Sequence, residues 1–108
     1  MPIYMKIEPS KAKNKKFKAT FSHIKDGKFQ KIKSSQFGDS RYQDYTQHKD
    51  KERRKQYRAR HKKDLSKGTY MSPGFLSFYL LWGDSSSLNT NINSYIKKFN
   101  LKRGTAKK

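Results

Sequence analysis

The chain has 108 residues, of which 31% are hydrophobic and 14% are aromatic, and this length and composition fit one modest domain. Its 27 lysine and arginine residues against 8 acidic residues leave a net charge of +19, which favours polyanionic partners. The absence of cysteine excludes disulfides and thiolate metal sites, and the short apolar stretches predict neither membrane insertion nor a secretory signal.

The first 15 residues predict a basic, flexible N-terminal arm. A short apolar patch comes first, and the cationic run KAKNKK follows it at residues 11–16. Such a run repels itself and confers no readout of a partner's sequence. We therefore expect the arm to lie outside the compact domain, which we place at residues 16–101.

A β-hairpin is predicted over residues 16–37, where aromatic and apolar residues alternate with polar ones. Asp26 and Gly27 form a strong hairpin-turn signal between the two strands. The register of the second strand stays open, because Phe29 and Ile32 fall on opposite faces. A hairpin alone is marginal in water, so it must pack on another element.

A structured loop over residues 38–49 and a basic helix over 50–65 are predicted next. Asp50 is a good N-cap, and the helix contains neither glycine nor proline. Nine basic residues lie between positions 49 and 63. The helix has only a thin apolar stripe, formed by Arg54, Tyr57, His61 and Leu65. We expect it to be docked along this stripe and otherwise solvated.

Two further helices are predicted in the less charged part of the chain. The first spans residues 73–82, is apolar nearly all round, starts at Ser72-Pro73 and ends at Gly83. The second spans residues 88–99, and a basic tail follows at 102–108. The predicted fold class is α+β, with a small β-hairpin packed on a compact bundle of about three helices and basic flexible arms at both ends.

The basic helix is the main candidate for binding a polyanion, because cations fixed on a rigid rod can track a phosphate backbone. The alternative is an ordinary solvated surface helix. We favour the functional interpretation, because few acidic residues lie at positions that would pair with these cations. The candidate polyanion-binding residues are Arg41, Lys49, Arg53, Arg54, Arg58, Arg60, Lys62 and Lys63.

The tyrosine-rich loop before this helix allows two interpretations. Tyr42 and Tyr45 fit either stacking on bases or anchoring to the core. Acid–base or metal chemistry is disfavoured, because His48 has no histidine or thiol at a metal-ligand spacing and only His61 as a distant partner. We expect no catalytic residue, metal or cofactor. The candidate docking residues are Tyr42, Asp44, Tyr45, His48, Asp50, Tyr57 and His61.

Two motifs carry a resemblance to a known family. Residues 42–61 fit the pattern YxDYTxHKDxxRxxxYxxRH, and residues 74–82 fit GFxSxxLLW. In these motifs the chain resembles an uncharacterised family of small basic proteins encoded by nucleocytoplasmic large DNA viruses, the giant viruses. The resemblance implies a viral origin and a place in the virion, with host cytoplasm or nucleus as the site during assembly.

Three functions follow as hypotheses. The first is a non-catalytic, virion-associated protein that binds nucleic acid through the phosphate backbone with low sequence specificity. DNA is favoured over RNA as the ligand. The alternative is a minor capsid or cement protein that docks on acidic capsid subunits. The third is a metal-dependent nuclease centred on Asp44, His48 and His61. The sequence leaves the oligomeric state open.

Overall fold

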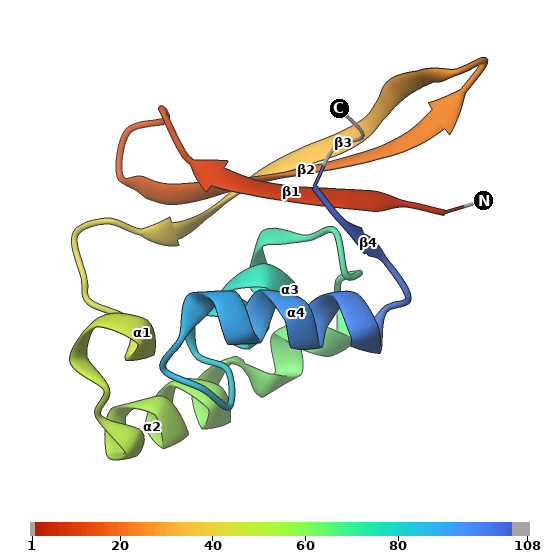
Figure 1. Cartoon of the computed structure of the whole chain (residues 1–108). Coiled ribbons are helices and arrows are strands. Elements are labelled where there is room, and N and C mark those ends of the chain that lie inside the picture. Colours follow the sequence, from red (N-terminus) through yellow and green to blue (C-terminus); the bar gives the residue numbers. More distant parts are fainter. Residues whose placement is uncertain (1, 105–108) are drawn as a thin grey trace.

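The computed structural model describes residues 2–104 as an α+β fold in which a four-stranded sheet carries its helices on one face (Figure 1). The strands are β1 (Tyr4–Pro9), β2 (Lys15–Lys25), β3 (Lys28–Asp39) and β4 (Lys102–Arg103). Their order across the sheet is β3-β2-β1-β4. Both β1 with β2 and β2 with β3 pair antiparallel, whereas β1 and β4 run parallel. The predicted fold class is confirmed.

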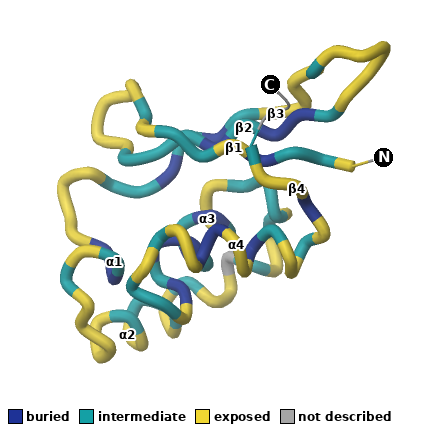
Figure 2. Tube along the Cα trace, viewed as in Figure 1, coloured by how far each residue is buried: buried dark blue, intermediate teal, exposed yellow. Residues whose placement is uncertain are grey.

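The predicted hairpin is formed by β2 and β3, with the turn at the expected dipeptide. Asp26 (φ 54°) and Gly27 (φ 76°) are both left-handed, as a two-residue turn of type I′ requires. The hairpin is longer than predicted at both ends. Its tip extends beyond the helical layer, and the residues around the turn are exposed (Figures 1 and 2).

A β-bulge settles the register that the sequence left open. Phe21 pairs with Lys33, whereas the next residue, Ser22, pairs with Lys31. Ile32 is therefore the extra residue in β3, and the alternation of faces changes at this point. The bulge explains why Phe29 and Ile32 do not follow one alternation, and strand pairing continues on both sides of it.

The predicted N-terminal arm is wrong, because residues 4–9 form strand β1 inside the sheet. Met5 pairs with Phe21 and is fully buried, and Ile7 pairs with Ala19. Apolar residues alternate with polar ones at residues 3–7, but this strand pattern is short. The lysine run that follows at residues 11–16 favoured the prediction of an arm. That lysine run forms the turn into β2, where Asn14 takes a left-handed conformation (φ 64°).

The predicted C-terminal tail is also partly wrong, since its first two residues form β4. Asn100 is left-handed (φ 55°), and the Leu101 amide donates a hydrogen bond to the Ile96 carbonyl oxygen at 2.8 Å. This is a Schellman helix end. It turns the chain back so that the Lys102 amide donates to the Ile3 carbonyl at 2.8 Å. Residues 105–108 of the predicted tail lie outside the described residues.

The helical layer contains the three predicted helices and one additional turn. Its elements are α1 (Tyr45–His48), α2 (Lys51–His61), a 3-10 turn (Lys62–Ser66), α3 (Pro73–Leu76), a π-helical segment (Ser77–Leu81) and α4 (Leu88–Lys98). Helix α1 interrupts the predicted loop. The predicted helix 73–82 is instead one α-turn followed by a π-turn. Within residues 2–104, no helix has both the length and the apolarity needed to cross a bilayer.

The helix caps follow the sequence closely. The Asp50 side chain accepts hydrogen bonds from the Glu52 and Arg53 amides at 3.0 and 3.2 Å, and Ser87 accepts one from Thr90. These side chains satisfy amides that the first helical turn leaves without a partner. The predicted starts of α2 and α4 are confirmed.

The hydrophobic core lies between the sheet and the helices (Figure 2). Both layers contribute large side chains that are almost fully buried, among them Phe21 and Phe37 from the sheet and Tyr95 from α4. The predicted aromatic helix supplies Leu76, Phe78, Leu80 and Leu81. Close packing of these side chains has to stabilise the fold, because the chain has no disulfide.

Glycine is needed at position 83 for close packing and not as the C-terminal cap of the aromatic helix. It does not take the left-handed conformation of a C-terminal cap. A Cβ atom at this position would lie 2.1 Å from the Tyr79 carbonyl oxygen and 3.0 Å from the Asn91 side chain. Glycine is required here because the chain passes too close to its neighbours for any side chain.

Candidate functional site

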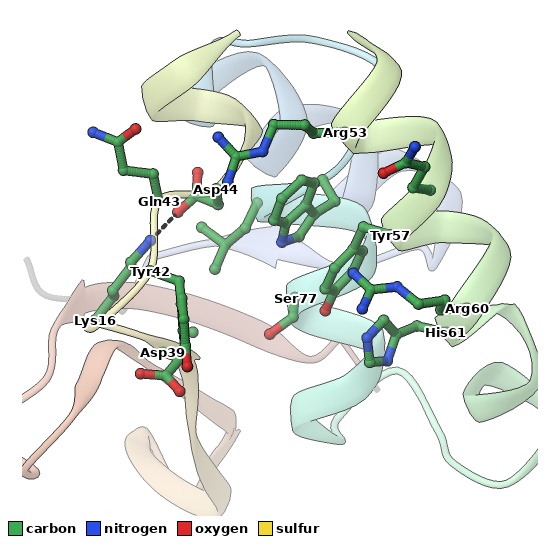
Figure 3. A pocket seen from close by; sticks show the side chains of 14 residues that line it. Lys16, Asp39, Tyr42, Gln43, Asp44, Arg53, Tyr57, Arg60, His61 and Ser77 are labelled. Carbon is green, nitrogen blue, oxygen red and sulfur yellow. Dashed lines mark hydrogen bonds and ion pairs between the residues drawn. The ribbon is translucent and has the colours of Figure 1, made fainter. Parts of the chain in front are cut away.

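A cleft of about 520 Å³ opens where the end of the sheet meets the tyrosine-rich loop, α2 and the π-helical segment (Figure 3). The loop lines it with Tyr42 and Asp44, and helix α2 lines it with Arg53, Tyr57 and Arg60. These three residues of α2 are spaced i, i+4 and i+7, so they share one helical face. A cleft of this size fits a small organic ligand or one unit of a polymer.

An ion pair at the base of the cleft joins the sheet to the loop. The Lys16 ammonium donates to Oδ2 of Asp44 at 2.6 Å, and both side chains are largely buried, with 12% and 4% exposed. Lys16 also donates to Oε1 of Gln47. Charges removed from water in this way need a partner of opposite sign. The pair therefore holds the loop against the start of β2.

Asp44 also caps helix α1. Its Oδ1 accepts hydrogen bonds from the Thr46 amide at 2.8 Å and from the Thr46 hydroxyl. The Gln47 side chain returns a bond by accepting from the Asp44 amide at 3.0 Å, which completes a capping box. The carboxylate thus uses both oxygens for structure, and its assignment to a docking surface is corrected.

His48 is a structural residue at the end of α1. Its Nδ1 accepts a hydrogen bond from the Asp50 amide at 2.9 Å, so the neutral ring carries its proton on Nε2. Nε2 is buried and has no hydrogen-bond partner among the described residues. Burial, followed by the positive charge of Arg53, lowers the pKa of His48. The neutral ring packs against Trp82, with 5.2 Å between the ring centroids.

This environment predicts a pH dependence of stability. The unfolded chain binds a proton at His48 near pH 6.5, but the folded chain does so only at lower pH. Protonation therefore favours unfolding, and the free energy of unfolding should fall as the pH drops below about 6.5. Urea denaturation between pH 7.5 and 5 measures this decline. In His48→Asn, which keeps an acceptor but does not titrate, the decline should shrink; an unchanged decline would assign it to other groups.

Three aromatic rings form a stack along one wall of the cleft. Tyr57 lies between Trp82 and His61, with 4.2 Å between centroids on each side, and the planes of Tyr57 and Trp82 differ by only 7°. Trp82 is the single tryptophan of the chain. Tyr42 lies across the cleft from this stack and is 69% exposed (Figure 3). The cleft is therefore bordered by aromatic surface on both sides.

The two tyrosines of the loop have separate roles. Tyr45 is only 5% exposed and belongs to the buried residues, which agrees with the anchoring interpretation. Tyr42 is among the few large apolar side chains that stay exposed. Of the two tyrosines, only Tyr45 is anchored to the core, and the Tyr42 ring stays accessible to a partner.

Two of the predicted polyanion-binding arginines are half-buried and have partners within the protein. Arg54 donates to the carbonyl oxygens of Gly83 and Asp84 at 3.3 and 3.1 Å, and its guanidinium lies 4.8 Å from the Tyr45 ring centroid. Arg58 forms an ion pair with the Asp84 carboxylate at 2.9 Å and lies over the Phe78 ring. These contacts hold α2 against the segment around Gly83 and Asp84. Arg54 was part of the predicted contact stripe, and Arg58 adds a second cationic side chain to the contacts of the helix.

Arg41 has a carboxylate partner of its own. Its Nε and Nη2 donate to the two carboxylate oxygens of Asp39 at 3.0 and 2.8 Å. The side-chain hydrogen bond from Arg41 is the main reason that the pKa of Asp39 falls to about 2. The Arg41 side chain stays 63% exposed, so Asp39 balances its charge without either group being buried.

The other cations of α2 and its flanks are exposed. None of them takes part in an ion pair between described side chains. These exposed cations are Lys49, Lys51, Arg53, Lys55, Arg60, Lys62 and Lys63. Helix α2 lies at the edge of the helical layer farthest from the sheet, so this surface is open to large partners (Figure 1). We refer to these seven residues as the α2 cationic surface.

Sequence reasoning found part of the cleft and missed part. It named Tyr42, Tyr57, His61, Arg53 and Arg60, which the structure brings together. It did not name Gln56 of α2, and it did not name the partners contributed by distant segments, among them Lys16 and Ser77. No sequence signal joins these segments, because their proximity depends on how α2 and the π-helical segment pack against the end of the sheet.

A second group of exposed lysines was also missed. Lys25, Lys28, Lys31 and Lys33 surround the tip of the hairpin. Their signal in the sequence was the density of lysine within a predicted hairpin. They lie on a different element from the α2 cationic surface, and this separation supplies a control for experiments on binding.

His48 and His61, two residues of the nuclease hypothesis, are not brought together in the structure. His48 contacts Trp82, and His61 contacts Tyr57, so two stacked rings separate the two imidazoles. The third residue of that hypothesis, Asp44, is committed to Lys16 and the α1 cap. In the part of the chain that the structure describes, no three histidine or acidic side chains are grouped to hold a metal ion.

The fold and the site define a small α+β protein with an aromatic, cationic cleft beside a basic helix. Residues 5–61 match a family of unknown function, DUF5754, and the chain belongs to that family. The match extends from β1 to the last residue of α2, so it includes the loop and helix that line much of the cleft. No curated protein and no solved structure matches the chain.

Proposed function

We propose that this protein is a non-catalytic nucleic-acid-binding protein that contacts phosphates through the α2 cationic surface. One observation carries the proposal: seven cations are exposed on one helix and its flanks without ion pairs between described side chains. Holding like charges together costs free energy, and a polyanion relieves this repulsion. Neutralising the phosphates of a nucleic acid also releases the counterions condensed on it, which favours binding. The contacts are to the backbone, so the proposed sequence specificity is low.

Salt titration of binding tests the proposal. We expect a labelled DNA duplex to be bound at low salt, with affinity that falls steeply as salt rises. Replacing Arg53, Arg60, Lys62 and Lys63 by glutamine should reduce the slope of log affinity against log salt by about 0.9 per phosphate contact removed. Fluorescence anisotropy at four or more salt concentrations measures this slope.

The hairpin tip supplies the matched control. Replacing Lys25, Lys28, Lys31 and Lys33 by glutamine removes the same charge from a different element. This variant should retain most of the slope if α2 is the contact surface. Equal losses in the two variants would contradict the assignment to α2, and no binding at low salt would end the proposal altogether.

The viral resemblance supplies the competing partner. The α2 cationic surface also complements acidic protein, and the resemblance to proteins of large DNA viruses makes an acidic capsid subunit the alternative partner. If the protein occurs in such particles, we expect it to leave with the genome when the particles are fractionated. Retention in the shell after removal of the genome would favour the capsid partner instead.

A further inference from the structure

The cleft beside α2 has features that phosphate binding alone does not require. A phosphate backbone needs exposed cations, and the outer side of α2 already presents them. The cleft adds aromatic surface on both sides and a volume of about 520 Å³, which is within the range of small-ligand sites. A partner of the whole site must therefore offer a flat apolar group as well as negative charge.

Tyr42 is suited to stack on such a group. Its ring is 69% exposed and lies across the cleft from the stacked rings of Tyr57 and Trp82. The guanidinium of Arg41 lies 6.0 Å from its centroid, near the limit of a cation–π contact. A nucleobase that enters the cleft would cover this ring and remove it from water, as aromatic side chains do in proteins that bind single strands.

The cations of the cleft lie beside this aromatic surface. Arg53 and Arg60 are separated by two helical turns, about 10 Å along the axis, with Tyr57 between them. Neither arginine takes part in an ion pair between described side chains, whereas Lys16 and Asp44 neutralise each other below them. Two arginines at this spacing can contact phosphates on either side of one bound nucleotide.

The walls also carry neutral hydrogen-bonding groups. Gln43, Gln56 and the Ser77 hydroxyl line the cleft, and amides and hydroxyls of this kind can bind the edge of a base. In a duplex these edges and faces are paired and stacked, so a duplex cannot fill the cleft without extruding a base. A single strand offers an unstacked base at no such cost.

We propose that the cleft binds one unstacked nucleotide of a single-stranded nucleic acid, with its base on Tyr42 and its phosphates at Arg53 and Arg60. This inference rests on the proposed function and deepens it. Duplex is then bound by the α2 cationic surface, which includes Arg53 and Arg60, whereas a single strand also uses the aromatic walls of the cleft. An acidic peptide would use the cations but leave the aromatic walls uncovered.

Comparison of single-stranded and duplex ligands tests the inference. Anisotropy is measured at one low salt concentration with a labelled oligothymidylate and with a duplex of the same length. Tyr42→Ala should weaken binding of the single strand by about 10-fold, the effect of losing one base–aromatic stack, and leave duplex binding unchanged. Because Tyr42 is so exposed, this variant should fold, and urea denaturation checks that it does.

Two further measurements separate this inference from the proposed function. The double variant Lys62→Gln, Lys63→Gln changes two residues of the α2 cationic surface that do not line the cleft. It should lower the affinity for the single strand and for the duplex by similar factors. The emission of Trp82, the single tryptophan, should change with the single strand and not with the duplex at equal occupancy. Binding of both ligands with no selective effect of Tyr42→Ala would overturn the inference and leave the proposed function standing. Absence of binding to either ligand would overturn both.

Discussion

Asp44→Ala should lower the free energy of unfolding by about 3 to 5 kcal/mol, the usual cost of breaking a buried ion pair by removing one partner. The substitution leaves the Lys16 ammonium, which is only 12% exposed, without its carboxylate. It also removes the acceptor that caps α1 through the Thr46 amide. Urea denaturation followed by circular dichroism measures the loss.

A double-mutant cycle separates the ion pair from the cap. In a Lys16→Met background no buried ammonium remains, so Asp44→Ala should cost distinctly less than it does in the wild-type background. Asp44→Asn keeps a cap acceptor and should lie between wild type and Asp44→Ala. An equal cost of Asp44→Ala in both backgrounds would show that the ion pair contributes nothing and that the cap carries the whole effect.

Gly83→Ala should be the other strongly destabilising substitution, with a loss of about 3 kcal/mol or more if the backbone cannot move aside. The added methyl group would lie 2.1 Å from the Tyr79 carbonyl oxygen, much closer than van der Waals contact allows. It would also press on Asn91, which is buried and donates to the carbonyl oxygens of Leu80 and Ser85 at 2.9 and 2.7 Å. The midpoint of thermal or urea unfolding measures the effect.

Gly27→Ala is the matched control for this substitution. Gly27 is left-handed (φ 76°), but a Cβ atom there would meet nothing within 4 Å. Its replacement should therefore cost only the conformational penalty of about 1 kcal/mol. Similar losses at Gly27 and Gly83 would contradict the steric explanation for Gly83.

Local signals in the sequence predicted the elements whose causes are local. The turn at Asp26 and Gly27 and the caps at Asp50 and Ser87 depend on the conformation and hydrogen bonds of a few neighbouring residues. The aromatic helix was predicted as core because it is apolar nearly all round. These features were confirmed because each depends on residues that are close together in the chain.

The elements that were mispredicted depend on distant partners. Strand β1 is too short and too close to a lysine run to be predicted by itself, but pairing with β2 buries Met5. The Schellman turn at Asn100 brings β4 beside β1, although no local strand signal marks Lys102. In both cases the sheet supplies hydrogen bonds and burial that the isolated segment lacks.

The features of the candidate site likewise divide into those that depend on local sequence and those that depend on distant contacts. The sequence by itself determined the large positive charge, the basic helix and fewer than half of the residues that line the cleft, because these follow from composition and helical spacing. Only the tertiary structure decided which charges are open to a partner. Packing gave Arg54 and Arg58 partners within the protein, buried Asp44 against Lys16, and left Tyr42 exposed across the cleft from Tyr57. The physical reason is that burial and pairing depend on contacts between segments distant in the sequence, whereas charge and helical spacing can be read along the chain.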